Sequence, residues 1–452
     1  MMIDTYKKAH TFEEIDNAVR LDIPINFEHE FFTDFSDVRG DFEDKMIYRS
    51  LNVNPRTLKY NFRQNSYNKT LLFLAGMRGS GKTSELSKIT SKLNHAEAFF
   101  CVTCDLDKVD DGLDKNDMEY MDILIFQLEK LVLKLRKNNI IVPSSILESM
   151  YKWYEERIKE VNKSIIREGG LEIEVEAKTP SLLSFLGLSA KLKSNLAGNK
   201  ENAEKIRSIF KQNFTIFSQK FNEFIETVNL VLRKRNVAKE VLFIIDGLEK
   251  VATTEIRKKI IDEESNRIRQ IKVSTIFTLP IELFALEPKL RQFSTIVPFP
   301  FVKIVERSGQ KVEKAIEKFY EFVLKRVDKS LFDEKETVIN AICHSGGSPR
   351  ELLRIIEYAY LFSDSEATQI TKSALAKAIK KLAAEYSRYI SQSELDQLKL
   401  LKENNEKGKP TPFDNEWQSL LEKMTILEYN DGTYKRVHPL VEASQIYKDY
   451  VG

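Results

Sequence analysis

Eight consecutive residues, GMRGSGKT at positions 76–83, carry the clearest chemical signal in this sequence, between an apolar stretch at 71–75 and a predicted helix at 84–93. Glycines at this spacing let backbone N–H groups turn toward phosphate oxygens, which the positive end of the following helix also attracts. Lys82 would reach the β and γ phosphates, and the Thr83 hydroxyl would bind Mg²⁺. The run predicts a nucleoside triphosphate site, with a glycine-rich turn as the alternative. The nucleotide contacts predicted here are Gly76, Arg78, Gly79, Ser80, Gly81, Lys82, Thr83 and Ser84.

An acidic pair follows a second apolar stretch further along the chain. Residues 241–245 are all apolar and lead into Asp246, with Glu249 three positions later. A buried central strand delivers a carboxylate to its C-terminal edge, so Asp246 is expected to bind Mg²⁺ opposite Thr83. Glu249 is expected to act as the base for the attacking water, or else to be a surface acid in a turn that opens a helix.

Three other polar residues are candidates for contacts with the γ phosphate. Thr278 ends an apolar strand and would sense the phosphate if that strand lies beside the loop strand; a capping role in the strand is the alternative. Arg291 follows in a polar segment and would reach the nucleotide of a neighbouring subunit, or else lie on the surface. Arg350 follows two glycines, a serine and a proline, which predict a helix start, so it would fold over the phosphates from a lid.

The elements around these residues alternate between strand and helix from residue 70 onward, which predicts a parallel α/β sheet. Residues 141–239 exceed a minimal sheet domain and read as an insertion, with a helix at 144–167, a strand-like run at 171–177 and a long helix at 202–235. Packing of an apolar stripe on the long helix against the sheet domain is favoured, and a partner-binding face is the alternative. The members of the stripe are Ile206, Phe210, Phe214, Phe217, Phe221, Phe224, Ile225, Val228 and Val231.

Composition excludes several classes of function. Lys and Arg total 70 against 68 acidic residues, so no global field attracts nucleic acid or an anionic membrane. The N-terminus lacks the apolar core of a signal peptide and no apolar stretch reaches the length of a membrane span, so we expect a cytoplasmic protein without a membrane partner. Cys101 and Cys104 have the spacing of a redox or zinc pair, but on one strand they point to opposite faces, so core cysteines are expected.

In chain order, the loop at 76–83, the Asp246 strand, the Thr278 strand, the Arg291 segment and the helix start at Arg350 resemble the AAA+ superfamily. Within it they resemble the signal-transduction ATPases with numerous domains (STAND) and the initiator-like ATPases of the origin-recognition type. The resemblance implies a variant Walker B motif at Asp246 with its base displaced, sensor 1 at Thr278, an arginine-finger region at Arg291 and sensor 2 at Arg350. It also implies ATP or ADP with Mg²⁺ as ligands, and hydrolysis of ATP.

The fold implied is α/β: a P-loop NTPase with an AAA+-like parallel sheet core, a helical insertion, an α-helical lid and a C-terminal winged helix. An Asn-Asp-Gly turn between apolar runs at 426–437 predicts the hairpin of that last domain. Residues 388–452 carry nine basic and eleven acidic side chains, with Lys435 and Arg436 as the one local basic cluster, so protein contacts are favoured over DNA. The predicted segments are an N-terminal segment packing on the nucleotide domain (1–69), the ATPase domain (70–310, with the insertion at 141–239), the lid (311–387) and the winged helix (388–452).

These observations predict an ATP-dependent molecular switch. ATP between sheet domain and lid would hold one arrangement, and slow, Mg²⁺-dependent hydrolysis would release another that forms a homo-oligomer or engages a protein partner. The resemblance to bacterial STAND-like ATPases implies signalling or defence, and since no toxin, nuclease, protease or membrane-effector motif is visible, a separate protein would supply the output. A DNA-binding initiator or loader that uses the winged helix is the alternative, and a nucleotide-stabilised scaffold without turnover is the third hypothesis.

Overall fold

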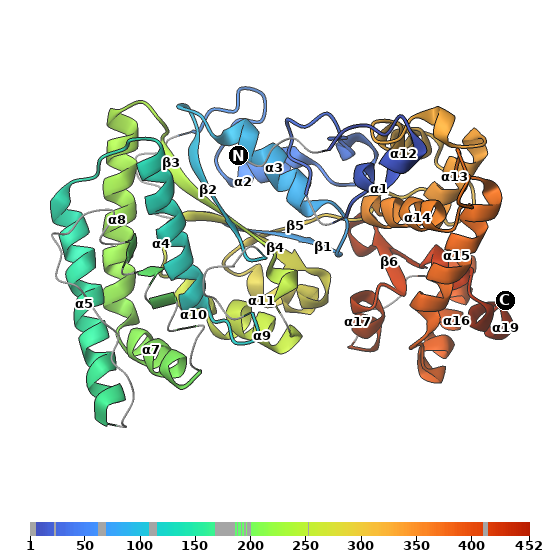
Figure 1. Ribbon diagram of the computed structural model, residues 1–452. Coiled ribbons are helices and arrows are strands. Elements are labelled where there is room, and N and C mark those ends of the chain that lie inside the picture. Colours follow the sequence, from blue (N-terminus) through green and yellow to red (C-terminus); the bar gives the residue numbers. More distant parts are fainter. Residues whose placement is uncertain are drawn as a thin grey trace.

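The computed structural model has a parallel five-stranded sheet at its centre, in the order β2-β3-β4-β1-β5 (Figure 1). The structure describes residues 6–21, 24–61, 69–107, 115–167, 200–251, 253–409 and 415–452, together with 186–187, 189–190, 192–193 and 196. Helices cover both faces of the sheet, which is why its strands are almost continuously apolar, and the predicted α/β class is confirmed. The strands are β1 (Leu71–Gly76), β2 (Phe99–Asp105), β3 (Glu240–Asp246), β4 (Ser274–Pro280) and β5 (Thr295–Pro298).

Two sets of helices cover the two faces. The helices are α2 (Asp44–Ser50) and α3 (Lys82–Leu93) on one face, and α4 (Tyr120–Lys137) and α8 (Phe214–Lys234) on the other. Alternation along β2 places Cys101 in the core of the first face and Cys104 in the core of the second. Both thiols are free and buried, and burial raises the pKa of Cys101 to about 12. They are core cysteines, as predicted.

The insertion adds an outer layer to the second face, where α5 (Ser144–Arg167) packs on α7 (Lys200–Gln212) and α8 (Figure 1). The prediction of one long helix at 202–235 is wrong, because the helix is interrupted at Asn213 and forms two helices. The Asn213 Nδ2 donates to Ile209 O at 2.8 Å. The apolar stripe nevertheless joins the core that contains the sheet residue Phe243, so the core-packing interpretation is confirmed. The predicted strand-like run at 171–177 lies outside the described residues.

Short helices follow β3 and β4 at the C-terminal edge of the sheet. A π-helix at Lys259–Glu263 separates the first two of them. They are α9 (Thr254–Lys258), α10 (Ser265–Ile268) and α11 (Glu287–Leu290).

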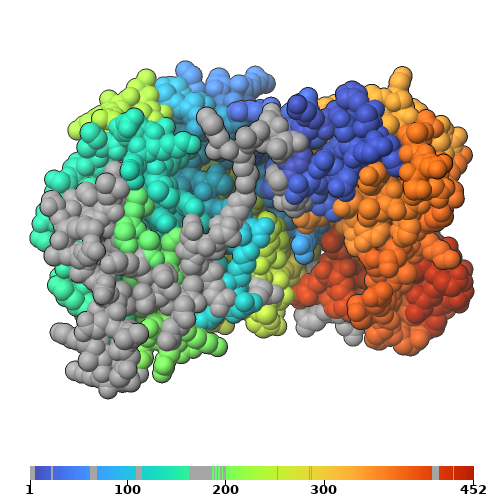
Figure 2. Space-filling model, in the orientation of Figure 1, coloured from blue at the N-terminus to red at the C-terminus, as the bar shows by residue number. Residues whose placement is uncertain are grey.

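The predicted lid is a helical region with a core of its own, which residues near the N-terminus complete. Backbone pairing of Ala9 with Val327 and ring contacts of Phe35 with Phe319 join the two segments. Figure 2 shows this N-terminal segment, in dark blue, lying against the orange helical region. The helices are α1 (Ile15–Ala18), α12 (Glu313–Leu324), α13 (Lys335–His344), α14 (Pro349–Leu361) and α15 (Lys372–Ser387).

The C-terminal region contains the predicted hairpin, with its turn at Asn430–Gly432. Its core extends to Met77 of the predicted phosphate loop, the GMRGSGKT run at 76–83. The winged-helix assignment stays a prediction. Among the described residues, no helix combines the length and apolar character needed to cross a bilayer. The elements are α16 (Gln392–Glu406), α17 (Asn415–Glu422), β6 (Ile426–Tyr429), β7 (Tyr434–Val437), α18 (Pro439–Glu442) and α19 (Gln445–Tyr450).

Candidate nucleotide-binding site

The GMRGSGKT run forms a loop at the C-terminal edge of the sheet, between β1 and α3. Gly79 and Gly81 have φ angles of 82° and 97°, a conformation that side chains rarely adopt. Lys82 folds back into the loop, where its Nζ donates to Gly76 O and Met77 O, each at 2.9 Å. These carbonyls keep the ammonium group inside the loop, within a turn of backbone that exposes N–H groups at a helix start. That combination suits a phosphate group.

Thr278 lies on the strand next to the loop strand, as its predicted role requires. In the parallel pairing of β1 with β4, Thr278 is opposite Leu74. Its hydroxyl accepts a hydrogen bond from Gly247 N at 3.1 Å and donates to Glu249 Oε2 at 3.4 Å. Thr278 therefore positions the turn that follows Asp246 and orients Glu249.

The two acids of the predicted site interact, and their pKa values shift in opposite directions. Burial raises the pKa of Asp246, and the charge of Glu249 adds to that rise, against a hydrogen bond from Thr83 and the charge of Lys82. Two carboxylates beside a hydroxyl are a donor set that suits Mg²⁺, which Thr83 and Asp246 would hold. Burial would raise the pKa of Glu249 as well, but Lys82 and the Thr278 hydroxyl lower it below its ordinary value. Glu249 is thus ionised at neutral pH, as a general base must be.

The start of α14 contacts the phosphate loop directly. The Ser348 hydroxyl caps α14 by accepting from Glu351 N at 3.3 Å, and it donates to Gly79 O at 3.3 Å. Arg350 lies so close that a Cβ on Gly79 would be 3.2 Å from the Cβ of Arg350. Burial, followed by the like charge of Arg78, lowers the pKa of Arg350. An anion between these two guanidinium groups would relieve their repulsion.

The predicted nucleotide contacts fall into three groups around one cavity of about 670 Å³. Gly76 and Ser80 are buried beside the cavity, and Thr278 reaches it through Glu249. Arg291 is exposed in the turn between α11 and β5 and does not line the cavity, so its contact with a neighbouring subunit stays a prediction. The predicted site residues that line the cavity directly are Arg78, Gly79, Gly81, Lys82, Thr83, Ser84, Glu249 and Arg350.

The rest of the cavity wall is mainly apolar, and most of its apolar side chains come from the N-terminal segment and the helical region. The whole wall carries seven basic and three acidic side chains, which favours an anionic ligand. An apolar wall joined to a cationic one suits a nucleotide, whose base and phosphates have these two characters. The apolar members are Leu21, Pro24, Ile25, Phe31, Phe32, Phe35, Phe299, Phe322, Pro349 and Leu353, with Val251 from the turn after β3.

Two buried arginines in this wall were not predicted from the sequence. Arg39 is 3% exposed, lies 3.9 Å from the centre of the Phe299 ring and donates to Pro300 O at 2.5 Å. It approaches the phosphate loop, since a Cβ on Gly81 would be 3.8 Å from Arg39 Nη2. Arg326, after α12, is equally buried. No motif marks either residue, because each reaches the cavity only through the tertiary fold.

Two solved structures resemble this chain over most of its length. A Walker-type ATPase of Pyrococcus abyssi aligns with a TM-score of 0.41 and 15% identity, over 94% of this chain and 99% of that one. The Orc1 protein of Aeropyrum pernix, solved in complex with DNA, aligns with a TM-score of 0.33 and 10% identity, over 91% of this chain and 81% of that one. No family model matches the sequence, and no curated protein matches it. The loop after β1, the acid at the end of β3 and the position of β4 between these two strands agree with the parallel α/β sheet core that the sequence predicts.

Proposed function

We propose that this protein is an ATP-binding molecular switch that hydrolyses ATP slowly and controls the engagement of a protein partner. One contact carries the proposal: Met77 of the phosphate loop is 2% exposed and packs in the core of the C-terminal region, with Ile426 and Leu427. A loop that changes around phosphates would therefore disturb that region directly. Such a switch suits STAND-like signalling or defence, in which a separate protein supplies the output.

The segment before α14 supports the same coupling. Tyr429 of β6 donates its hydroxyl hydrogen bond to Gly346 O at 2.7 Å, and a Cβ on Gly346 would be 2.2 Å from Leu427 Cδ1. Two residues later, Ser348 bonds to the phosphate loop. A nucleotide that shifts the start of α14 would loosen the contact with β6, so ATP and ADP would favour different positions of the C-terminal region.

Hydrolysis would use the residues at the edge of the sheet. Lys82 would neutralise charge on the β and γ phosphates, and Glu249 would orient a water and accept its proton as the water attacks. Mg²⁺ held by Thr83 and Asp246 would supply further charge compensation. Because Glu249 also bonds to Thr278, part of its basicity is already used, which favours slow turnover.

Phosphate release from ATP, measured with and without Mg²⁺, tests the enzymatic half. Lys82→Ala should lose both nucleotide binding and release, whereas Glu249→Gln should bind ATP and release no phosphate. Hydrogen exchange across 388–452 and the mass of the particle, each compared in ATP and in ADP, test the switching half. Exchange and mass that are identical in the two nucleotides would refute the switch and leave a scaffold.

A DNA-binding initiator remains the second candidate, and the pairing of the hairpin cations bears on it. Lys435 is 5% exposed and pairs with Glu428 at 3.3 Å, and Arg436 pairs with Glu442 at 2.9 Å. Contacts to DNA phosphates would have to break these ion pairs, which favours a protein partner. DNA binding at low salt that disappears in the Lys435→Ala, Arg436→Ala double variant would reverse this preference.

A further inference from the structure

Arg326 is 3% exposed, and no carboxylate among the residues that the structure describes pairs with it. Its side chain lies 3.8 Å from the centre of the Phe322 ring and 5.0 Å from that of Phe31. Among the residues that the structure describes, its side chain forms one hydrogen bond, from Nη1 to Phe322 O at 2.9 Å, and no ion pair. Burial lowers the pKa of Arg326 to about 9. The guanidinium group thus lines the cavity with donors that the described part of the fold does not use.

The surrounding wall is aromatic and holds a second unused polar group. Phe31, Phe32 and Phe322 all line the cavity beside Arg326. Lys325 Nζ donates to Phe32 O at 2.6 Å, which ties this segment to the end of α12. Thr33, the next residue, is 9% exposed, and its Oγ1 has no hydrogen-bond partner in the described structure.

A buried charge that is not paired with an opposite charge is expensive, so a ligand that accepts hydrogen bonds from the guanidinium group would explain its presence. The phosphates of a nucleotide belong at the loop around Lys82, which leaves the flat base for the aromatic wall. A guanidinium group only donates, so it requires an acceptor on the edge of that base. Purines present the acceptor N7 on their imidazole ring, whereas the cytosine acceptors O2 and N3 lie on its Watson–Crick side, so the two kinds of base offer acceptors at different positions.

We propose that Arg326 determines base specificity by donating to an acceptor on the edge of a purine, with Thr33 as a supporting contact. This inference rests on the proposed function, because it assumes that the phosphate loop holds the triphosphate. Phe322 and Phe31 both contact the guanidinium group, which lines the cavity. A purine nucleotide then satisfies Lys82 at one part of the wall and Arg326 at another.

Calorimetric titration with Mg²⁺ and four ligands tests the inference: ATP, GTP, CTP and inorganic tripolyphosphate. The native protein should bind ATP or GTP about tenfold more tightly than CTP, the size expected for one charged hydrogen bond. Arg326→Met keeps the apolar packing between the two rings and should lower purine affinity to the CTP level. Its affinities for CTP and tripolyphosphate should stay unchanged, a selectivity effect that a purely structural role would not produce.

Arg326→Lys retains the charge without the planar fork and should give an intermediate preference for purines, so a second variant remains should the first fold poorly. Equal losses for ATP, CTP and tripolyphosphate in Arg326→Met would overturn the inference, as would a native protein that binds ATP, GTP and CTP equally. Lys82→Ala should lose all four ligands. Failure of the native protein to bind any of them would instead refute the proposed function.

Discussion

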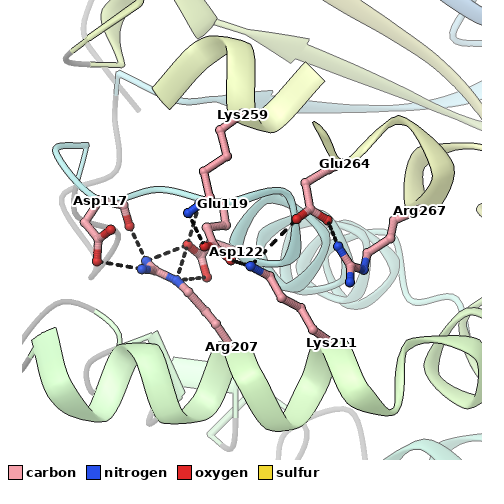
Figure 3. Close-up of polar contacts among 8 residues, drawn as sticks. All are labelled: Asp117, Glu119, Asp122, Arg207, Lys211, Lys259, Glu264 and Arg267. Atoms are coloured by element: carbon pink, nitrogen blue, oxygen red, sulfur yellow. Dashed lines mark hydrogen bonds and ion pairs between the residues drawn. The ribbon is translucent and has the colours of Figure 1, made fainter. Parts of the chain in front are cut away.

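Two clusters of buried charge in this molecule hold arginines in opposite circumstances. In the first, Arg207 of α7 lies between the carboxylates of Asp117 and Asp122, at 2.6 and 2.7 Å (Figure 3). Four cations and four carboxylates meet there and join the insertion to the start of α4 and to the segment after β3. We name this the ion-pair cluster. Its members are Asp117, Glu119, Asp122, Arg207, Lys211, Lys259, Glu264 and Arg267.

The second cluster lines the cavity beside the predicted phosphate loop, where basic side chains outnumber acidic ones. Burial alone would lower the pKa of Arg207, but Asp122 and Asp117 raise it above its ordinary value. Burial lowers the pKa of Arg326 instead, and no carboxylate among the described residues pairs with it. The charge of Arg207 is compensated within the fold, so the loss of one partner would strand the other, whereas Arg326 would be completed by the ligand that we propose.

The largest expected effect concerns the ion-pair cluster. Arg207→Met should lower the free energy of unfolding by about 3–5 kcal/mol, because Asp122, 1% exposed, loses its cation inside the protein. Urea unfolding measures this loss. Adding Asp122→Leu removes the stranded charge and should restore part of the stability. A fall in ATP affinity with stability unchanged would place Arg207 with the ligand and break the comparison.

Removal of Lys82 should produce the largest loss of ligand binding. Lys82→Ala is expected to weaken ATP binding by about a hundredfold or more, since the ammonium group would neutralise the β and γ phosphates. Titration calorimetry measures the change. Glu249→Gln is the matched control in the same cavity, because it should lose turnover and keep ATP binding. ATP affinity that survives in Lys82→Ala would remove the electrostatic basis of the site.

The parts of the molecule that the sequence predicted are those with local signals. Glycine spacing predicted the phosphate loop, and apolar runs ending in Asp246 and Thr278 predicted two strands of the sheet. The break at Asn213 interrupts no apolar periodicity, so α7 and α8 read as one helix. The role proposed for Arg326 depends on Phe31, which is distant in the sequence, and on the absence of a carboxylate from its surroundings among the described residues. Neither property can be read from neighbouring residues.

Arg326→Met sharpens the comparison through stability. Removal of a buried, uncompensated charge should leave the thermal midpoint of the ligand-free protein unchanged or higher, in contrast to Arg207→Met. With saturating ATP, the native protein should have the higher thermal midpoint, because tighter ATP binding stabilises it more than the variant. Thermal unfolding with and without ATP measures both quantities. A variant destabilised as strongly as Arg207→Met would show that Arg326 serves the fold.

Two threonines allow the same comparison between a polar group in the cavity and one hydrogen-bonded within the fold, with the smallest expected effects. Thr33→Val keeps the shape of the side chain and removes a hydroxyl without a partner among the described residues, so stability should not fall, while ATP affinity should drop about threefold. Thr337 is the matched control: it is 1% exposed, and its hydroxyl donates to Asp333 Oδ1 at 2.5 Å. Thr337→Val should lower stability by about 1 kcal/mol and leave ATP affinity intact. If both variants lose stability equally and neither loses ATP, the Thr33 hydroxyl makes no contact with the base, and Arg326 alone would read the purine.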